Sequence, residues 1–268
     1  MGNESESMIE IEDLHFAYGG NKVFNGINLK IPRGKVVAVL GMGGSGKSTL
    51  LRLIGGQLTP KHGTIKVNGQ VVHELDRQGL FDLRRNMGLM FQAGGLFSDM
   101  SVFENVAFPM RELTDLPDEM IHDLVLMKLH AVGLRGTTHL MPNELSGGMA
   151  RRVALARAIA IDPMLTMYDE PFAGLDPISL NVIAQLIRRL NDALRGTSIV
   201  VTYDVSESLK VVDYVYLLHD GLVQAEGTSQ ELLESKAPFV VQFLHAHPTG
   251  PVAFHMESPP YKEDMGVS

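Results

Sequence analysis

Alternating apolar and polar residues in the first quarter of the chain predict β-strands. One alternating run covers residues 9–18 and another covers 23–31, with Gly19-Gly20-Asn21 as a turn between them. A further hairpin is expected at Asn68-Gly69, because Asn-Gly between alternating runs favours a tight turn. These strands predict an antiparallel sheet at one edge of the fold.

Continuous apolar runs farther along the chain predict buried strands, and helical patterns separate them. The runs are residues 36–40, 88–91, 165–168 and 199–201. Strands alternating with helices predict an α/β domain over residues 8–235, with a helical subdomain inserted at about 95–161. From residue 236 to 268 the composition shifts to Pro, His and polar residues. We expect an extended C-terminal tail there that binds a partner.

Capping patterns mark the starts of several helices. Ser101 and Glu104 have the spacing of a capping box, as do Thr228 and Glu231. Asp176-Pro177 predicts a long helix, because Asp is a favoured N-cap and Pro fits the first turn. The residues expected along one apolar side of that helix are Ile178, Val182, Leu186 and Leu190.

A glycine-rich segment between a predicted strand and a predicted helix carries the first chemical motif. Gly41-Met42-Gly43-Gly44-Ser45-Gly46-Lys47-Ser48, followed by Thr49, fits the phosphate-binding loop. Glycines leave backbone N–H groups accessible, and a helix N-terminus adds unpaired donors. Lys47 would contact the β- and γ-phosphates of ATP, and Ser48 would bind Mg²⁺. A glycine-rich turn with an exposed Lys is the alternative for this motif alone.

Other candidate residues lie at the ends of predicted strands and at a helix start. Gln92 could reach a metal ion or a water, or cap the next turn. Ser146-Gly147-Gly148 precedes a helix and could form a second anion site, although a plain helix cap would need only the Ser.

Two adjacent acids, Asp169 and Glu170, end the strand at 165–168. Alternation along a strand would place them on opposite faces, so that Asp169 could hold Mg²⁺ while Glu170 approaches the nucleophile. Paired surface acids are the alternative. Tyr18 could stack on adenine or be an ordinary strand aromatic.

Composition limits the class of protein. The chain has no Cys, which excludes disulfides and thiolate metal sites and fits a cytosolic location. A formal net charge of −8 argues against a nucleic-acid-binding surface. No apolar run reaches the 18 residues or so typical of a spanning helix, and the polar start is unlike a signal peptide. Glu6 occupies the position where a myristoylation motif has Ser or Thr.

Taken in chain order, the motifs resemble the ATP-binding-cassette (ABC) ATPases over about residues 9–234. They are the Lys47 loop, Gln92, Leu145-Ser146-Gly147-Gly148, Asp169-Glu170 and Asp176. The resemblance implies that Tyr18 stacks on adenine and that Gln92 joins the metal or the attacking water. It also implies that Asp169 supports Mg²⁺ and Glu170 is the general base. Ser146 and Gly148 would bind the γ-phosphate of ATP held by a second copy of the chain.

A narrower resemblance is to the branch of this family that drives phospholipid transport between the two membranes of Gram-negative bacteria. It rests on residues 95–102, 140–149, 151–160, 167–172 and 250–254. This branch implies an ATP-hydrolysing subunit on the cytoplasmic face of the inner membrane. The implied partners are an integral-membrane permease, a small STAS-domain subunit and, through the complex, a lipid-binding MCE-type subunit.

The chain departs from the family pattern at several positions. Met42-Gly43 replaces the usual Pro-Ser, Leu175 replaces a Gln, and Thr166 interrupts an apolar strand. Tyr203 stands where the family has its switch His. An imidazole can change protonation near neutral pH, whereas a phenol stays a neutral hydroxyl. An ATP-gated clamp with weak hydrolysis is therefore one alternative, and the ATPase of another importer is the second.

Overall fold

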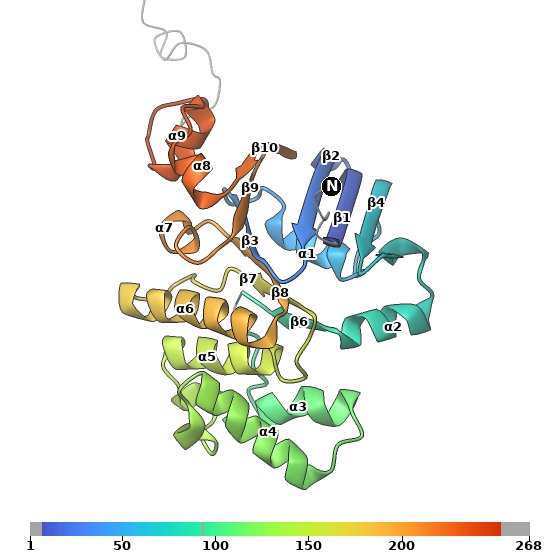
Figure 1. Ribbon diagram of the computed structural model, residues 1–268, viewed down its shortest axis with the longest axis vertical. Coiled ribbons are helices and arrows are strands. Elements are labelled where there is room, and N and C mark those ends of the chain that lie inside the picture. The colour runs from blue at the N-terminus through green and yellow to red at the C-terminus, as the bar shows by residue number, and fades with distance from the viewer. Residues whose placement is uncertain (1–6, 93, 253–268) are drawn as a thin grey trace, which may run out of the picture.

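The structure is a computed structural model that describes residues 7–92 and 94–252. Its centre is a six-stranded sheet in the order β10-β9-β3-β8-β7-β6 (Figure 1). The strands are β3 (Val36–Gly41), β6 (Met87–Met90), β7 (Leu165–Asp169), β8 (Thr197–Thr202), β9 (Tyr214–His219) and β10 (Leu222–Gly227). All neighbours are parallel except β9 and β10, which form an antiparallel hairpin. The central strand β3 is buried on both faces, as a continuous apolar run requires.

The second sheet is antiparallel and has the order β2-β1-β4-β5. Its strands are β1 (Ser7–Tyr18), β2 (Asn21–Pro32), β4 (His62–Val67) and β5 (Gln70–Val71). Apolar side chains of this sheet pack with α1 (Lys47–Ile54) and with one face of the central sheet in a shared core. The predicted antiparallel edge and α/β core are both confirmed.

Helices cover the opposite side of the central sheet (Figure 1). They are α3 (Val102–Leu113), α4 (Asp118–Ala131), α5 (Gly147–Ala158) and α6 (Pro177–Leu194). The shorter helices are α2 (Arg77–Arg85), α7 (Val205–Ser208), α8 (Ser229–Leu233) and α9 (Pro238–Leu244). Helices α3, α4 and α5 fall in the region expected to be a helical insertion.

Two predicted helix details differ in the structure. Ser101 caps α3 through the Glu104 N–H, but the Glu104 carboxylate pairs with Arg111 instead of completing a capping box. On α6, Leu186 and Leu190 are buried, whereas Ile178 is 79% exposed and Val182 39% exposed. The buried stripe of α6 begins only at Ile183, so its first turns present apolar side chains to solvent.

The segment after residue 236 is not simply extended. Pro238 begins α9, where its missing N–H costs nothing, and Val240 is buried in a core shared with β3, β9 and α8. The Gln242 amide exchanges hydrogen bonds with the backbone of Val252, at 2.9 and 2.8 Å. This contact holds residue 252 beside α9. Phe254, Met256 and Tyr261, expected to bind a partner, lie outside the described residues.

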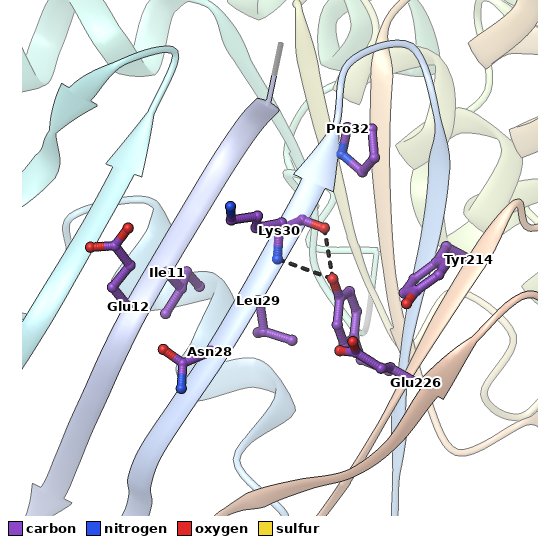
Figure 2. A pocket seen from close by; sticks show the side chains of 9 residues that line it. Ile11, Glu12, Asn28, Leu29, Lys30, Pro32, Tyr214 and Glu226 are labelled. Carbon is purple, nitrogen blue, oxygen red and sulfur yellow. Dashed lines mark hydrogen bonds between the residues drawn. The ribbon is translucent and has the colours of Figure 1, made fainter. Parts of the chain in front are cut away.

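A cavity of about 440 Å³ lies where the two sheets meet, between β1, β2, β9 and β10 (Figure 2). Tyr216 is one of the lining residues, and its hydroxyl accepts from the Lys30 N–H at 3.0 Å and donates to the Lys30 carbonyl at 2.7 Å. Burial raises the pKa of Tyr216 to about 12, so this hydroxyl stays protonated and keeps donating. Tyr216 thereby connects β2 of the antiparallel sheet to β9 of the central sheet.

Candidate nucleotide-binding site

The phosphate loop follows β3 and turns directly into α1. Gly46 precedes the helix with a φ of 93°, and a Cβ there would lie 2.6 Å from Val23 and 2.9 Å from Phe24. Any other residue would therefore strain the turn and collide with β2. Gly43 and Gly44 are exposed at the tip of the loop. The loop geometry is the one that the sequence predicts for a strand–loop–helix phosphate site.

Lys47 is buried beneath this loop. Its Nζ donates to the carbonyl oxygens of Gly41 at 2.8 Å and Met42 at 3.1 Å, and lies 3.4 Å from Glu170 Oε1. The ammonium group is therefore held at the loop by three oxygen atoms. This placement keeps a positive charge where the phosphates of a nucleotide would lie.

Ser48 and Asp169 form an oxygen pair beside Lys47. The Ser48 hydroxyl donates to Asp169 Oδ1 at 2.9 Å, and both residues line a cavity of about 350 Å³. Burial raises the pKa of Asp169, and the Ser48 hydrogen bond and the charges of Lys47 and Arg52 oppose this shift. Hydroxyl and carboxylate oxygens are the ligands that Mg²⁺ prefers, so the pair fits that ion.

Arg52 was not among the predicted site residues. It lies one helical turn after Ser48 and lines the same cavity. The sequence could have indicated Arg52, because residues four apart on a helix lie on the same side and Arg52 is four residues after Ser48.

Glu170 lies just beyond the end of β7, with a φ of 47°. Alternation along the strand no longer applies there, so the expectation that Asp169 and Glu170 lie on opposite faces is wrong. Both carboxylates contact the start of α1, Asp169 through Ser48 and Glu170 through Lys47. The second Glu170 oxygen, Oε2, accepts from the Tyr203 backbone N–H at 3.2 Å.

Tyr203 follows β8 and presents a side chain that is 53% exposed. Its backbone, not its hydroxyl, makes the hydrogen bond to Glu170. The phenol of Tyr203 also interacts electrostatically with Arg151. Burial lowers the pKa of Arg151, and the interaction with Tyr203 partly offsets that decrease. The structure thus brings Tyr203 to the predicted catalytic carboxylate.

Gln92 lies just beyond β6 and is exposed. Arg151 of α5 donates to the Gln92 carbonyl oxygen and, at 3.1 Å, to the carbonyl oxygen of Ala173. Arg151 therefore joins the loop that carries Gln92 to the loop that follows Glu170. This linking role was not predicted, because it depends on two carbonyl groups that no sequence motif marks.

Tyr18 ends β1 beside the phosphate-loop helix. Its hydroxyl lies 3.4 Å from Thr49 Oγ1, and its ring is 44% exposed with an edge contact to Phe16. An exposed ring at this position is available for a stacking partner. The sequence prediction that Tyr18 and the loop belong to one site is consistent with this placement.

The motif Ser146-Gly147-Gly148 lies at the start of α5, and its Ser and first Gly are exposed. Ser146 is the N-cap and accepts from the Met149 N–H at 3.3 Å. A Cβ on Gly148 would lie 2.9 Å from Ser179 Oγ, so glycine permits close packing of α5 on α6. Asp176 in turn accepts from Ser179 Oγ at 2.5 Å and caps α6, as predicted. These contacts are with helices of the same chain, and the motif presents its N-terminal end to solvent.

Comparisons with known proteins agree with this geometry. Residues 24–173 match the family described as ABC transporter. The chain is 52% identical over 261 residues to the intermembrane phospholipid transport system ATP-binding protein MlaF of Haemophilus influenzae, covering 97% of this chain and 99% of the relative.

Solved structures agree with the fold. One is cbiO1 from Clostridium perfringens, part of the ABC transporter complex cbiONQ, with a TM-score of 0.80 and 32% identity, covering 88% of this chain and 95% of that one. Another is a dimeric, post-hydrolysis ATP-binding cassette, MJ0796, bound to ADP and Pi. It has a TM-score of 0.76 and 30% identity and covers 83% of this chain and 99% of its own. The chain therefore belongs to the ABC transporter family, as one of its ATP-binding subunits.

Proposed function

We propose that this protein hydrolyses ATP to drive phospholipid transport between the inner and outer membranes of a Gram-negative bacterium. The observation that carries the proposal is the similarity to the phospholipid-transport relative, which extends over nearly the whole of both chains. A generic cassette ATPase would share the nucleotide site without sharing the ends of the chain.

We assign the site residues as follows. Lys47 and the N–H groups of Gly41–Ser48 hold the phosphates, Tyr18 stacks on adenine, and Thr49 supports Tyr18 through their side-chain contact. Mg²⁺ would be held by Ser48 and Asp169, with Gln92 proposed as a further ligand, and would neutralise charge on the β- and γ-phosphates. Glu170 accepts a proton from the attacking water, because it is the carboxylate that Lys47 and the Tyr203 backbone fix beside the loop.

A second copy of the chain completes the site. Ser146, Gly147 and Gly148 sit at an exposed helix N-terminus, where N–H groups can donate to a phosphate held by the partner. Asp176 and Ile178 are both exposed at the start of α6. We propose that they lie on the surface that contacts the second copy. The similar cassette bound to ADP and Pi is dimeric, which supports a dimer here.

The proposed partners are a membrane-embedded permease, a small STAS-domain subunit and an MCE-type lipid-binding subunit. Among residues 7–92 and 94–252, no helix is long and apolar enough to cross a membrane. A chain of this kind needs a permease to act on lipid, so we place it on the cytoplasmic face of the inner membrane, attached through that partner.

The test uses the complete transporter, purified through its membrane subunit and reconstituted into vesicles with fluorescent phospholipid. ATP should drive lipid transfer by the parent complex. Lys47→Ala should remove turnover and transfer together, because it deletes the only side-chain cation of the phosphate loop. ATPase activity that persists in Lys47→Ala would contradict the site. ATPase activity without any coupled lipid transfer, or stimulated by amino acids instead, would contradict the substrate class.

A second candidate function is an ATP-gated clamp that hydrolyses slowly. The observation that favours it is Tyr203, a half-exposed phenol that replaces the imidazole expected at this position. The steady-state ATPase rate of the intact complex separates the two functions. A clamp would bind ATP and close, but its ATPase rate would be low.

A further inference from the structure

A cluster of two histidines and an aspartate lies on the antiparallel sheet, apart from the residues assigned to the nucleotide. Asp13 Oδ1 lies 3.0 Å from His15 Nε2, and Asp13 Oδ2 lies 3.1 Å from His62 Nδ1. The potential ligand atoms of the three residues all lie within 4.8 Å of one another. Imidazole nitrogens and a carboxylate oxygen are the ligands of many zinc sites.

A β-bulge in β1 brings these side chains together. His15 pairs directly with His62 of β4, and Glu12 pairs with Thr64, so two residues of β1 face the single residue Gly63. Ile11 and Leu14 are both buried although they are three residues apart, which shows the extra residue in the strand. Because of this insertion, Asp13 and His15 emerge on the same exposed face as His62.

Two glycines leave room for the bulge and its side chains. Gly63 has a φ of 87°, and a Cβ there would lie 2.1 Å from the Asp13 carbonyl oxygen. Gly26 of β2 lies against the cluster itself: a Cβ there would come within 3.0 Å of Asp13 Oδ1 and 3.3 Å of His15 Nε2. The Asp13 N–H is held by Asn28 Oδ1 at 2.9 Å. Three strands thus contribute to a defined cradle.

We propose that Asp13, His15 and His62 form a binding site for Zn²⁺ or a similar transition-metal ion, which would link β1 to β4. With metal–ligand distances of about 2.0–2.1 Å, tetrahedral ligands lie about 3.3 Å apart. Each imidazole lies at a similar distance from one Asp13 oxygen, His15 from Oδ1 and His62 from Oδ2. Both histidines and Asp13 reach solvent in part, so an ion can enter and a water can supply the fourth ligand.

The ligand chemistry separates this site from the one assigned to Mg²⁺. Imidazole favours Zn²⁺, Co²⁺, Ni²⁺ and Cu²⁺, whereas Mg²⁺ prefers oxygen ligands such as those of Ser48 and Asp169. Excess Mg²⁺ should therefore occupy the oxygen site without displacing a transition metal from the histidines.

The experiment measures Zn²⁺ binding to the full chain by isothermal titration calorimetry in excess Mg²⁺ without nucleotide, with Co²⁺ as a spectroscopic probe of tetrahedral geometry. The variants are His15→Gln, His62→Gln and Asp13→Asn. Asn is chosen because Asp13 has a φ of 47°, a conformation that Asn tolerates. His122→Gln is the matched control, since His122 also contacts a carboxylate, Asp123 at 3.3 Å, but belongs to no group of three potential ligands among the described residues.

We expect one Zn²⁺ per chain, a higher Tm with Zn²⁺, and a tetrahedral Co²⁺ spectrum. Each of the three variants should weaken binding at least about 10-fold, because even residues that only orient ligands are worth 10–100-fold in affinity. His122→Gln should bind like the parent.

Three results would overturn the proposal. They are no Zn²⁺ binding by the parent chain, unchanged affinity in His15→Gln and His62→Gln, or loss of binding in His245→Gln instead. His245 and His247 form a separate pair of histidines at the end of α9. Circular dichroism of each variant without metal shows whether the sheet remains folded, so a loss of binding can be assigned to the ligand.

Discussion

At the scale of single residues, the proposed catalytic centre depends on contacts that one side chain and one backbone group make with the Glu170 carboxylate. Lys47 and Glu170 are both buried, with exposed fractions of only 6% each. A buried carboxylate needs such a partner, because an isolated buried charge is costly. The Tyr203 N–H occupies the other carboxylate oxygen. The carboxylate is thereby fixed beside the phosphate loop.

Tyr203→His should raise kcat with little change in ATP affinity. Any residue except Pro keeps the backbone N–H that contacts Glu170, so the substitution changes only the side chain. A well-aimed transition-state contact is worth up to about 10²–10³ in rate. Steady-state ATPase assays of the complex, with Tyr203→Phe as control, test this. If Tyr203→Phe loses activity and Tyr203→His gains none, the phenol itself serves the reaction.

Asp169→Asn should abolish Mg²⁺-dependent ATP binding without lowering stability. Burial raises the pKa of Asp169, so its ionisation costs the folded state free energy as the pH rises through the raised pKa. A neutral Asn avoids that cost and can still accept from Ser48. Without nucleotide, the Tm of the variant at pH 8 should equal or exceed that of the parent. The difference in Tm between the variant and the parent should decrease toward pH 4. A variant Tm below that of the parent at pH 8 would contradict this account.

At the scale of elements, a buried amide fixes the loop before α3. Asn105 is fully buried and accepts from the Phe97 N–H while its amide donates to the carbonyl oxygens of Phe97, Met100 and Ser101. Arg157 of α5 donates to the same Asn105 oxygen. One side chain therefore shapes the loop and connects it to the helix that carries Ser146.

Asn105→Leu should lower the free energy of unfolding by at least about 2 kcal/mol, because it removes the side-chain partner of the Phe97 N–H and of the Met100 carbonyl oxygen, at about 1–3 kcal/mol each. Urea denaturation of the full chain measures the change. The control Asn143→Leu, at an exposed position, should stay within about 0.5 kcal/mol of the parent. Equal effects of the two substitutions would refute the role of the Asn105 network.

At the scale of the whole molecule, the two halves of the proposed ATP site lie on different surfaces of one chain. The phosphate loop lies between the two sheets, and the Ser146 motif lies at the exposed start of α5. We therefore propose that a second chain brings its Ser146 motif to the nucleotide bound at this loop. The exposed Ile178 and Val182 of α6 add apolar surface next to Asp176.

Glu170→Gln should yield a stable dimer in ATP and Mg²⁺, because it removes the proton acceptor while ATP binding by the loop remains. Size-exclusion chromatography with light scattering measures the mass. Adding Ser146→Arg, which places a bulky charge at the exposed helix start, should return the protein to a monomer. A monomeric Glu170→Gln variant with ATP bound would contradict the composite site.

Local sequence determined much of this protein. The phosphate loop, the Asn-Gly hairpin and the cap at Asp176 each follow from residues that are neighbours in the chain, since their geometry depends on nearby backbone conformations. The antiparallel edge and the α/β core follow in the same way from the period of the apolar residues.

Only the tertiary structure decided which distant groups meet. Glu170 leaves the strand pattern at a positive φ and contacts Lys47 and the Tyr203 backbone, both far away in the chain. A bulge of one residue aligns Asp13 and His15 with His62, and packing against β9 turns the segment after Pro238 into a helix. Periodicity predicts which face of an element is apolar, but long-range packing and strand register decide what that face contacts.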